Sequence, residues 1–221
     1  GRGDLGQLGQ NDIIDRSSPV QIPGTTWNEV SIGYQYEQIK AGGTKTDGTL
    51  WMWGQNQFGQ LAQNNTTKYS SPVQVGSNTT WQYYYAGGFV HSIATKTDGT
   101  LWVWGKNNVG CLGLSQSAPT AYSSPVQIPG TTWQGSRFKL SSSSYNTMAI
   151  KTDGTLWMWG QNEGGQLGQN EGPAQNGYSS PVQIPGTTWD KVANVFYASY
   201  ATKTDGTLWA WGNNDAGALG L

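Results

Sequence analysis

The sequence predicts an all-β protein in which one small four-stranded sheet is repeated four times, and three observations indicate this. The segment KTDGTLW recurs at intervals of roughly 50 residues, a block SSPVQ precedes each copy, and each copy ends in a pair of tryptophans separated by one residue. The four segments begin at Lys45, Lys96, Lys151 and Lys203. Repeats of this length are typical of proteins that stack one supersecondary unit many times.

Four segments of the first repeat have the composition of short strands. The first, SPVQI from Ser18, alternates apolar and polar residues and ends at a Pro-Gly pair. The second begins at Trp27 with WNEVSI, the third ends at Lys45, and the fourth is TLWMW from Thr49. Bounded by turn residues and rich in β-branched and aromatic side chains, these segments favour extended structure.

The third and fourth expected strands are joined by an Asp-Gly pair, which is Asp47–Gly48 in the first repeat. This pair adopts positive φ angles at little steric cost, so we predict a type I′ hairpin turn.

The tryptophan pair identifies how the sheets are arranged. In TLWMW, Leu50 and Met52 lie on one face of the expected strand, and Trp51 and Trp53 lie on the other. A sheet with two apolar faces is covered on both sides. Four-stranded sheets stacked face to face around an axis are the blades of a β-propeller. We therefore predict a propeller of four repeats, each roughly 53 residues long, with the tryptophans packed between blades.

A glycine-rich loop follows each tryptophan pair and reads GQNQFGQLA from Gly54. Its glycines suit positive φ angles, its asparagine suits a bond to local backbone, and Leu61 is expected to anchor the loop on the core. The loop leads into a strand and not into a helix N-terminus, so we do not expect it to bind phosphate.

Residues Gly1–Gly9 and Gly212–Gly220 are two copies of this same loop. Because the two copies would compete for one place in a closed ring, we expect the chain to be a segment of something longer. We treat residues 1–221 as a single repeat domain with repeats at approximately 1–53, 54–104, 105–159 and 160–211. Residues 212–221 begin a further repeat.

Composition excludes several classes of function. The net charge is −1 and no basic run is present, which argues against a nucleic-acid partner. The single cysteine, Cys111, excludes an internal disulfide. No apolar run has the length of a membrane-spanning helix. Charged residues make up only 11% of the chain, so amides, hydroxyls and glycines are expected to cover its surface.

The motifs WG, GQLG and the Asp-Gly hairpin, at this repeat length, resemble the regulator of chromosome condensation (RCC1-like) repeat family. The resemblance covers essentially the whole chain, and the near-identical copies with their SSPVQIPGTTW spacer look like the bacterial and bacteriophage branch. It implies a β-propeller, most often of seven blades, so the four repeats are expected to be part of a larger ring.

Two departures limit what the resemblance implies. The recurrent histidine of the family survives only as His91, and the matching positions hold Lys40, Asn146 and Ala198. Nothing resembles the wedge insertion by which the nuclear member acts on its small GTPase. Nucleotide exchange is therefore not expected.

The sequence contains no group of residues that predicts catalysis. One histidine and one distant cysteine do not make a zinc site. The aspartates that recur in the Asp-Gly pairs are turn residues, because a functional carboxylate pair would break the repeat. We therefore predict no catalytic residue, no metal and no cofactor.

Binding residues are expected where the copies differ most, which is between the tryptophan of GTTW (NTTW in the second copy) and KTDG. Aromatic residues and arginine are common contact anchors, although alternate residues of these strands must pack between blades. About half of the residues there are expected to be core, and the others to line one rim of the ring. The rim candidates are Tyr34, Tyr36, Tyr84, Tyr85, Phe89, His91, Arg137, Tyr145, Phe196 and Tyr197.

We predict a non-enzymatic binding or structural scaffold that contacts a protein or a glycan, on a bacterial surface or a virion such as a phage tail or fibre. Self-association, or association with the remaining blades of a longer chain, is a further expectation. Two alternatives come from other classes: a polysaccharide-acting propeller enzyme, and a regulator or inhibitor of a GTPase or other enzyme through rim contacts. The fold does not choose among them.

Overall fold

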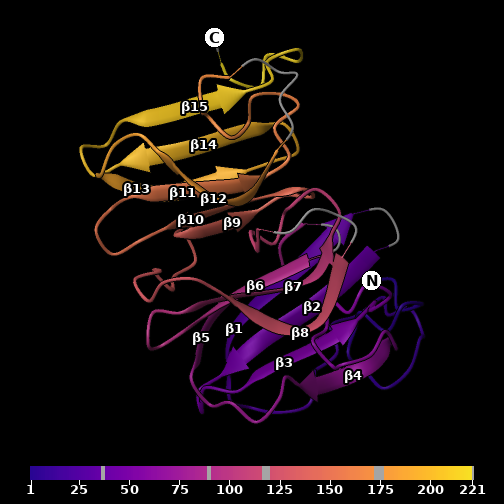
Figure 1. Ribbon diagram of the computed structural model, residues 1–221. Coiled ribbons are helices and arrows are strands. Elements are labelled where there is room, and N and C mark those ends of the chain that lie inside the picture. The colour runs from indigo at the N-terminus through magenta and orange to yellow at the C-terminus, as the bar shows by residue number, and fades with distance from the viewer. Residues whose placement is uncertain (36–37, 89–90, 116–119, 172–176, 221) are drawn as a thin grey trace.

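The computed structural model describes residues 1–35, 38–88, 91–115, 120–171 and 177–220. Within these ranges every named element is a β-strand, and the strands form four antiparallel sheets (Figure 1). The first sheet has the order β1-β2-β3-β4 and the second β5-β6-β7-β8. Their strands are β1 (Trp27–Gln35), β2 (Gln38–Lys45), β3 (Leu50–Gly54), β4 (Tyr69–Gln74), β5 (Trp81–Tyr85), β6 (His91–Lys96), β7 (Leu101–Asn107) and β8 (Thr120–Ile128).

The third sheet has the order β9-β10-β11-β12, and the fourth is a three-stranded sheet, β13-β14-β15. Their strands are β9 (Leu140–Ser142), β10 (Asn146–Ile150), β11 (Leu156–Gly160), β12 (Tyr178–Ile184), β13 (Trp189–Asn194), β14 (Ala198–Lys203) and β15 (Leu208–Gly212). The expected four-stranded blade is thus present three times, and β15 is an edge strand within the described residues.

The sheets are out of phase with the repeats as we divided the sequence. The first, second and fourth sheets begin at a GTTW-type tryptophan, whereas in the third Trp133 forms an isolated bridge before β9. The fourth strand comes from the SSPVQ block that follows the glycine-rich loop, so β3 pairs with β4 through Met52 and Val73. The first SSPVQ block has no preceding strand to pair with, and Ser18–Ile22 is not a strand. The physical reason is that an SSPVQ segment needs the tryptophan strand before it, not the one after it, as its hydrogen-bonding partner.

The four sheets stack face to face in chain order, with the N-terminal sheet at one end of the row and the C-terminal sheet at the other (Figure 1). Their first strands lie next to one another, since β1 contacts β5, β5 contacts β9 and β9 contacts β13. These strands therefore form the inner edge of the stack, and the SSPVQ strands form its outer edge.

The tryptophans of the third strand occupy two environments. Trp53, Trp104 and Trp159 are at most 2% exposed and pack edge-on against the tryptophan that begins their own sheet. The first tryptophans of these pairs, Trp51, Trp102 and Trp157, are half-buried. A lysine ammonium lies over each of their rings, and Lys96 Nζ is 4.0 Å from the Trp102 ring centroid. The prediction that the tryptophans are core residues is confirmed most fully for the second member of the first three pairs, whereas in the fourth Trp211 is half-buried and Trp209 is 48% exposed.

The Asp-Gly connection differs from the predicted turn. Gly48 has φ +77° but Asp47 does not share a positive φ, which a type I′ turn requires of both residues. Gly48 N donates to Lys45 O at 2.9 Å, and Lys45 N donates to Thr49 O at 2.9 Å. The connection is thus a type I turn followed by a left-handed glycine, so the type I′ prediction is wrong. The longer loop leaves the Asp47 carboxylate free to accept from Thr49.

The glycine-rich loops are anchored as expected. Leu61, Leu112 and Leu167 are fully buried, and each leucine N donates to the asparagine side chain five residues earlier. Each loop also contacts the next sheet, because Trp104 Nε1 donates to Gln60 O at 2.9 Å. The loops therefore join successive blades.

Candidate binding surface

His91 lies inside the stack, although we predicted it as a rim residue. It is fully buried, and its Nε2 is 2.6 Å from Ser142 Oγ and 3.2 Å from Thr147 Oγ1, both in the third sheet. Burial, reinforced by the positive charge of Lys40, lowers the pKa of His91 to about 3, so the imidazole is neutral near pH 7. The prediction of an exposed binding role is corrected, because the imidazole links two sheets.

Two of the three residues that match His91 in the other sheets, Lys40 and Asn146, make equivalent links. The pairing registers place Lys40, His91, Asn146 and Ala198 opposite the glycine of each WG pair, as predicted from spacing. Lys40 Nζ donates to Gly88 O at 2.7 Å, and the Asn194 amide donates to Asn146 Oδ1. These polar groups therefore hold each sheet to its successor.

Tyr84 is also a core residue. It is 1% exposed, stacks on Trp104 with the ring centroids 6.3 Å apart, and burial raises the pKa of its hydroxyl. Its neighbour Tyr85 is only half-buried. Because successive side chains of a strand point to opposite faces, one tyrosine enters the core and the other does not. Tyr84 is thus removed from the set of rim candidates.

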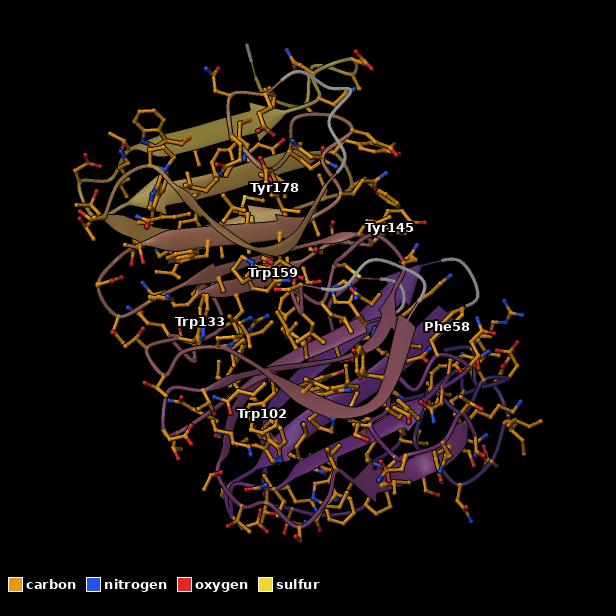
Figure 2. The ribbon with its side chains drawn as sticks, viewed as in Figure 1. Phe58, Trp102, Trp133, Tyr145, Trp159 and Tyr178 are labelled. Atoms are coloured by element: carbon orange, nitrogen blue, oxygen red, sulfur yellow. The ribbon has the colours of Figure 1, made fainter. Side chains whose placement is uncertain are left out.

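Other predicted residues are placed with less detail. Tyr36 and Phe89 lie outside the described residues, and only the backbone of Tyr34, in β1, is described. Tyr145 is half-buried in the turn between β9 and β10, and Figure 2 places it on the opposite side of the stack from Trp133. Their binding role stays a prediction.

Two of the predicted residues meet in one cavity. Tyr85 and Arg137 line a hollow of about 460 Å³ between the first strands of the four sheets. We call it the axial hollow, and its other lining residues are Val30, Ser31, Ile32, Tyr83, Phe138, Leu140, Ser141, Val192 and Ala193. Residues from β1, β5, β9 and β13, and from the segment before β9, thus converge on one site.

A second hollow of about 310 Å³ shares Ile32 with the first. Gly87, Gly88 and Ser142–Ser144 line one side of it, and Asn194, Val195 and Phe196 close its other side. Phe196 and Tyr197 are 44% and 42% exposed, and their ring centroids are 6.3 Å apart. Of these two predicted residues, Phe196 therefore borders the second hollow, and Tyr197 lies next to it.

The axial hollow exposes apolar side chains beside positive charge. Val30, Ile32 and Phe138 are 65%, 66% and 56% exposed. The side chain of Arg137 is exposed, and Lys191 Nζ lies 5.8 Å from the Phe138 ring centroid. Asp190 is neutralised by Lys139 at 2.8 Å, a contact that also lowers the pKa of the Asp190 carboxyl. Apolar residues flanked by an arginine and a lysine are suited to contact a protein segment.

Val30, Ile32 and Asn194 were not among the predicted site residues. For Val30 and Ile32 the sequence holds one indication, because they alternate with polar residues in the second expected strand and so lie on one face. That alternation cannot distinguish a face that meets another blade from a face that meets the axial hollow.

The described residues contain no group of three or more His, Cys, Asp or Glu side chains placed to hold a metal ion. In the same part of the chain no helix is long and apolar enough to cross a membrane. The axial hollow is lined by apolar, aromatic and cationic side chains, among them Val192, Tyr85 and Arg137.

Stacked four-stranded sheets with a hollow along their inner edge define a repeat protein of the β-propeller class. Three segments of the chain, 47–94, 98–150 and 153–202, match the Regulator of chromosome condensation (RCC1) repeat, and a second description of that repeat matches 139–166. Because these segments cover more than half of the chain, the chain belongs to the RCC1 repeat family.

Relatives of known identity share this assignment. The chain is 26% identical to the Ultraviolet-B receptor UVR8 of Arabidopsis thaliana over 100% of its own length and 50% of that protein. It is 31% identical to the mitochondrial RCC1 domain-containing protein RUG3 of the same plant, over 80% of the chain and 41% of that protein. The chain thus spans about half the length of these relatives.

Solved structures show the same fold. Yeast RCC1 (Prp20), in its complex with Kap60, superposes with a TM-score of 0.80 at 20% identity, over 96% of this chain and 50% of that one. Human WBSCR16 superposes with a TM-score of 0.78 at 20% identity, over 100% of this chain and 57% of that one. At this identity the similarity supports the fold alone.

Proposed function

We propose that the chain is a non-enzymatic scaffold that binds a protein partner at the axial hollow. The observation that carries the proposal is the convergence of Tyr85, Arg137 and the exposed Phe138 on one cavity. Protein interfaces are centred on such aromatic and arginine anchors. The second hollow beside it adds backbone groups of Gly87 and Gly88 and the exposed Phe196 to the surface that a partner can contact.

The relatives support a protein partner more than a glycan. Yeast RCC1 is described in complex with Kap60, and Prp20p is described with binding properties to Gsp1p and histones. Ubiquitin-protein ligases such as human HERC2 also contain a segment similar to this chain, which covers 4% of that protein. Regulation of a small GTPase or another enzyme through rim contacts is the alternative to this scaffold role.

The experiment is an affinity capture from the native source in which wild type is compared with Arg137→Glu combined with Phe138→Ser. We expect the double variant to lose the specific partner. The reason is that a negative charge replaces the Arg137 guanidinium and the contact area of the Phe138 ring is removed. Lys68→Glu, an exposed charge reversal before β4, is the control and should retain the partner. Equal capture by both variants would contradict the proposal.

A direct arm uses purified Gsp1p as the probe. Binding that the double variant loses, without acceleration of nucleotide release, supports a scaffold. Acceleration of release would instead favour a GTPase regulator. Turnover of surface polysaccharides that is lost when one Asp or Glu is replaced would favour the enzyme alternative.

The setting of the protein is a separate part of the proposal. Low charge, amide-rich loops and near-identical repeats support display on a bacterial surface or a phage particle. Antibody labelling of intact cells and of purified particles tests it, and signal found only after lysis would contradict it.

A further inference from the structure

The GTTW-type tryptophan of each repeat has an indole N–H that needs an acceptor, and three of the four repeats supply the same one. Trp27 Nε1 donates to Pro23 O at 3.3 Å, and Trp189 Nε1 donates to Pro185 O at 3.2 Å. Trp133 Nε1 donates to Pro129 O at 3.4 Å. Each acceptor is the proline carbonyl of the IPGTTW segment, four residues before the tryptophan.

The second sheet lacks this acceptor. Its segment reads VGSNTTW, which is one residue longer and has no proline. Trp81 is 4% exposed, and its Nε1 is a buried donor without a hydrogen-bond partner in the described part of the chain. A buried N–H without an acceptor is unfavourable, because it has lost water and gained nothing in exchange.

The missing Pro-Gly pair also leaves space. A Cβ built on Gly24 would lie 3.4 Å from Trp27 Nε1 and 3.7 Å from Lys45 Nζ, and the fourth sheet repeats this with Gly186, Trp189 and Lys203. The Pro-Gly turn thus covers both the indole nitrogen and the lysine ammonium. A Cβ on Gly76, in the second sheet, meets nothing within 4 Å.

A pocket of about 220 Å³ lies at this place. Trp81, Lys96 and Trp102 line it together with the altered turn at Val75, Gly76 and Asn78. Ala62, Asn64, Ser124 and Pro125 complete its wall. This pocket shares no lining residue with the axial hollow, so the two are separate.

The polar groups of the pocket are mainly donors. Lys96 Nζ lies 4.0 Å from the Trp102 ring centroid and 4.7 Å from that of Trp81, and it forms no ion pair among the described residues. The amide oxygens of Asn64 and Asn78 already accept from the hydroxyls of Ser124 and Thr80. Asp98 acts on Lys96 only at longer range, and desolvation lowers the pKa of Lys96.

We propose that this pocket binds a carboxylate group carried on a compact apolar body, with Trp81 Nε1 and Lys96 Nζ as its donors. Val75, Pro125 and the tryptophan rings contact the apolar body. The turn at Gly76 is exposed, and a Cβ built on Gly76 meets nothing within 4 Å. The turn therefore has room for the small shift that lets the carboxylate of the ligand reach Trp81 Nε1.

The test follows the indole N–H resonances of ¹⁵N-labelled protein while sodium isobutyrate is added at constant pH and ionic strength. The Trp81 resonance is identified by its loss in Trp81→Phe. We expect a saturable shift of the Trp81 resonance and no shift of those of Trp27, Trp133 and Trp189, whose N–H groups already have acceptors. A Trp81 resonance that does not move, or equal shifts at all four tryptophans, overturns the proposal.

Two variants separate the pocket from general effects. Replacing Val75–Asn78 by the sequence Ile-Pro-Gly rebuilds the segment of the other repeats, so we expect binding to weaken by about tenfold or more without a loss of melting temperature. Lys96→Met removes the charge and should make isobutyrate bind no better than isobutyramide. Unchanged isobutyrate binding in the Ile-Pro-Gly variant overturns the proposal even if every variant folds.

The source of the carboxylate is distinguished by a second probe. N-acetylvaline imitates the carboxyl terminus of a peptide, and isobutyrate imitates a free acid. Tighter binding of N-acetylvaline assigns the pocket to a peptide terminus, and tighter binding of isobutyrate assigns it to a small metabolite acid.

Discussion

His91 is the single histidine of the chain, and its burial makes folding depend on pH. Its pKa is about 3 in the folded protein and about 6.5 in the unfolded chain. Between these values the unfolded state binds one more proton, so the free energy of unfolding falls as the pH falls below 6.5. Lys40, whose pKa burial lowers to about 7, contributes little to this slope below pH 6.5.

The first prediction is that the free energy of unfolding decreases by about 1.5 kcal/mol between pH 6.5 and pH 5. Urea denaturation at both pH values measures it. The control is His91→Asn, which copies the residue that the third sheet carries as Asn146 and should remove most of the slope. An undiminished slope in that variant would assign the titration to other groups.

Tyr84 and Tyr85 show how strongly one residue's place in a strand decides its role. Tyr84 stacks on Trp104 inside the stack, whereas Tyr85 lines the axial hollow. A tyrosine in the core contributes packing that is lost on truncation, by about 3–5 kcal/mol for a large aromatic side chain. Loss of partner binding in a Tyr84 variant would therefore report unfolding and not a contact.

At the scale of the element, each Asp-Gly hairpin is held by the same three-residue cluster. Asp98 Oδ1 accepts from Thr100 N at 3.0 Å and from Thr100 Oγ1 at 2.7 Å, and Thr100 Oγ1 accepts from Trp102 Nε1 at 2.8 Å. The aspartate thus orients the hydroxyl, and the hydroxyl orients the half-buried tryptophan. The recurrence of Asp, Thr and Trp at fixed spacing has this structural cause.

The second prediction compares Thr100→Val with Thr207→Val, which remove the same hydroxyl from the second and fourth sheets. Thr100 is 6% exposed, so its variant should lose about 1–2 kcal/mol of stability, because it leaves the indole N–H and the carboxylate without their partner. Thr207 is exposed, and water replaces its bonds, so the change should stay within about 0.5 kcal/mol. Urea denaturation of both variants measures the difference, and equal losses would contradict the burial argument.

At the scale of the whole molecule, the position of a sheet in the stack decides how well the same residue is buried. Leu50, Leu101 and Leu156 are fully buried, but the equivalent Leu208 is 69% exposed. Leu101 pairs with Ile128 of β8 and Leu156 with Ile184 of β12. β15 has no such fourth strand in the described structure, so Leu208 lacks the neighbour that covers its counterparts.

The third prediction is that Leu101→Ala lowers the free energy of unfolding by about 2–5 kcal/mol and Leu208→Ala by less than about 0.5 kcal/mol. The difference follows from the apolar contacts that each side chain loses. Thermal and urea unfolding of the purified chain measure it. A large loss for Leu208→Ala would mean that this edge is covered in solution, and a dependence on protein concentration would identify a second copy as the cover.

The sequence by itself determined the repeat, most of the strands and the tryptophans that pack between sheets. Periodicity of two along TLWMW places leucine and tryptophan on opposite faces, and this is a local property of the chain. The preference for glycine at the left-handed turn position is also a local property. The turn type is not local, because it depends on the length of the loop, and that length is set by which residues of the two strands pair. The family resemblance and the predicted propeller fold rest on these local patterns, and both are confirmed.

Only the tertiary structure decided which faces meet another sheet and which meet solvent. Tyr84 and Tyr85 are neighbouring residues of the same type, so composition does not distinguish them. Their different burial follows from the register of β5 against β6 and from the contacts with the neighbouring sheet. His91 and Lys40 look like surface residues by type, yet contacts with the following sheet bury both. Burial depends on residues far away in the chain, and the local sequence pattern carries no information about them. The axial hollow could therefore not be predicted from the sequence, because it is formed by the first strands of four different sheets.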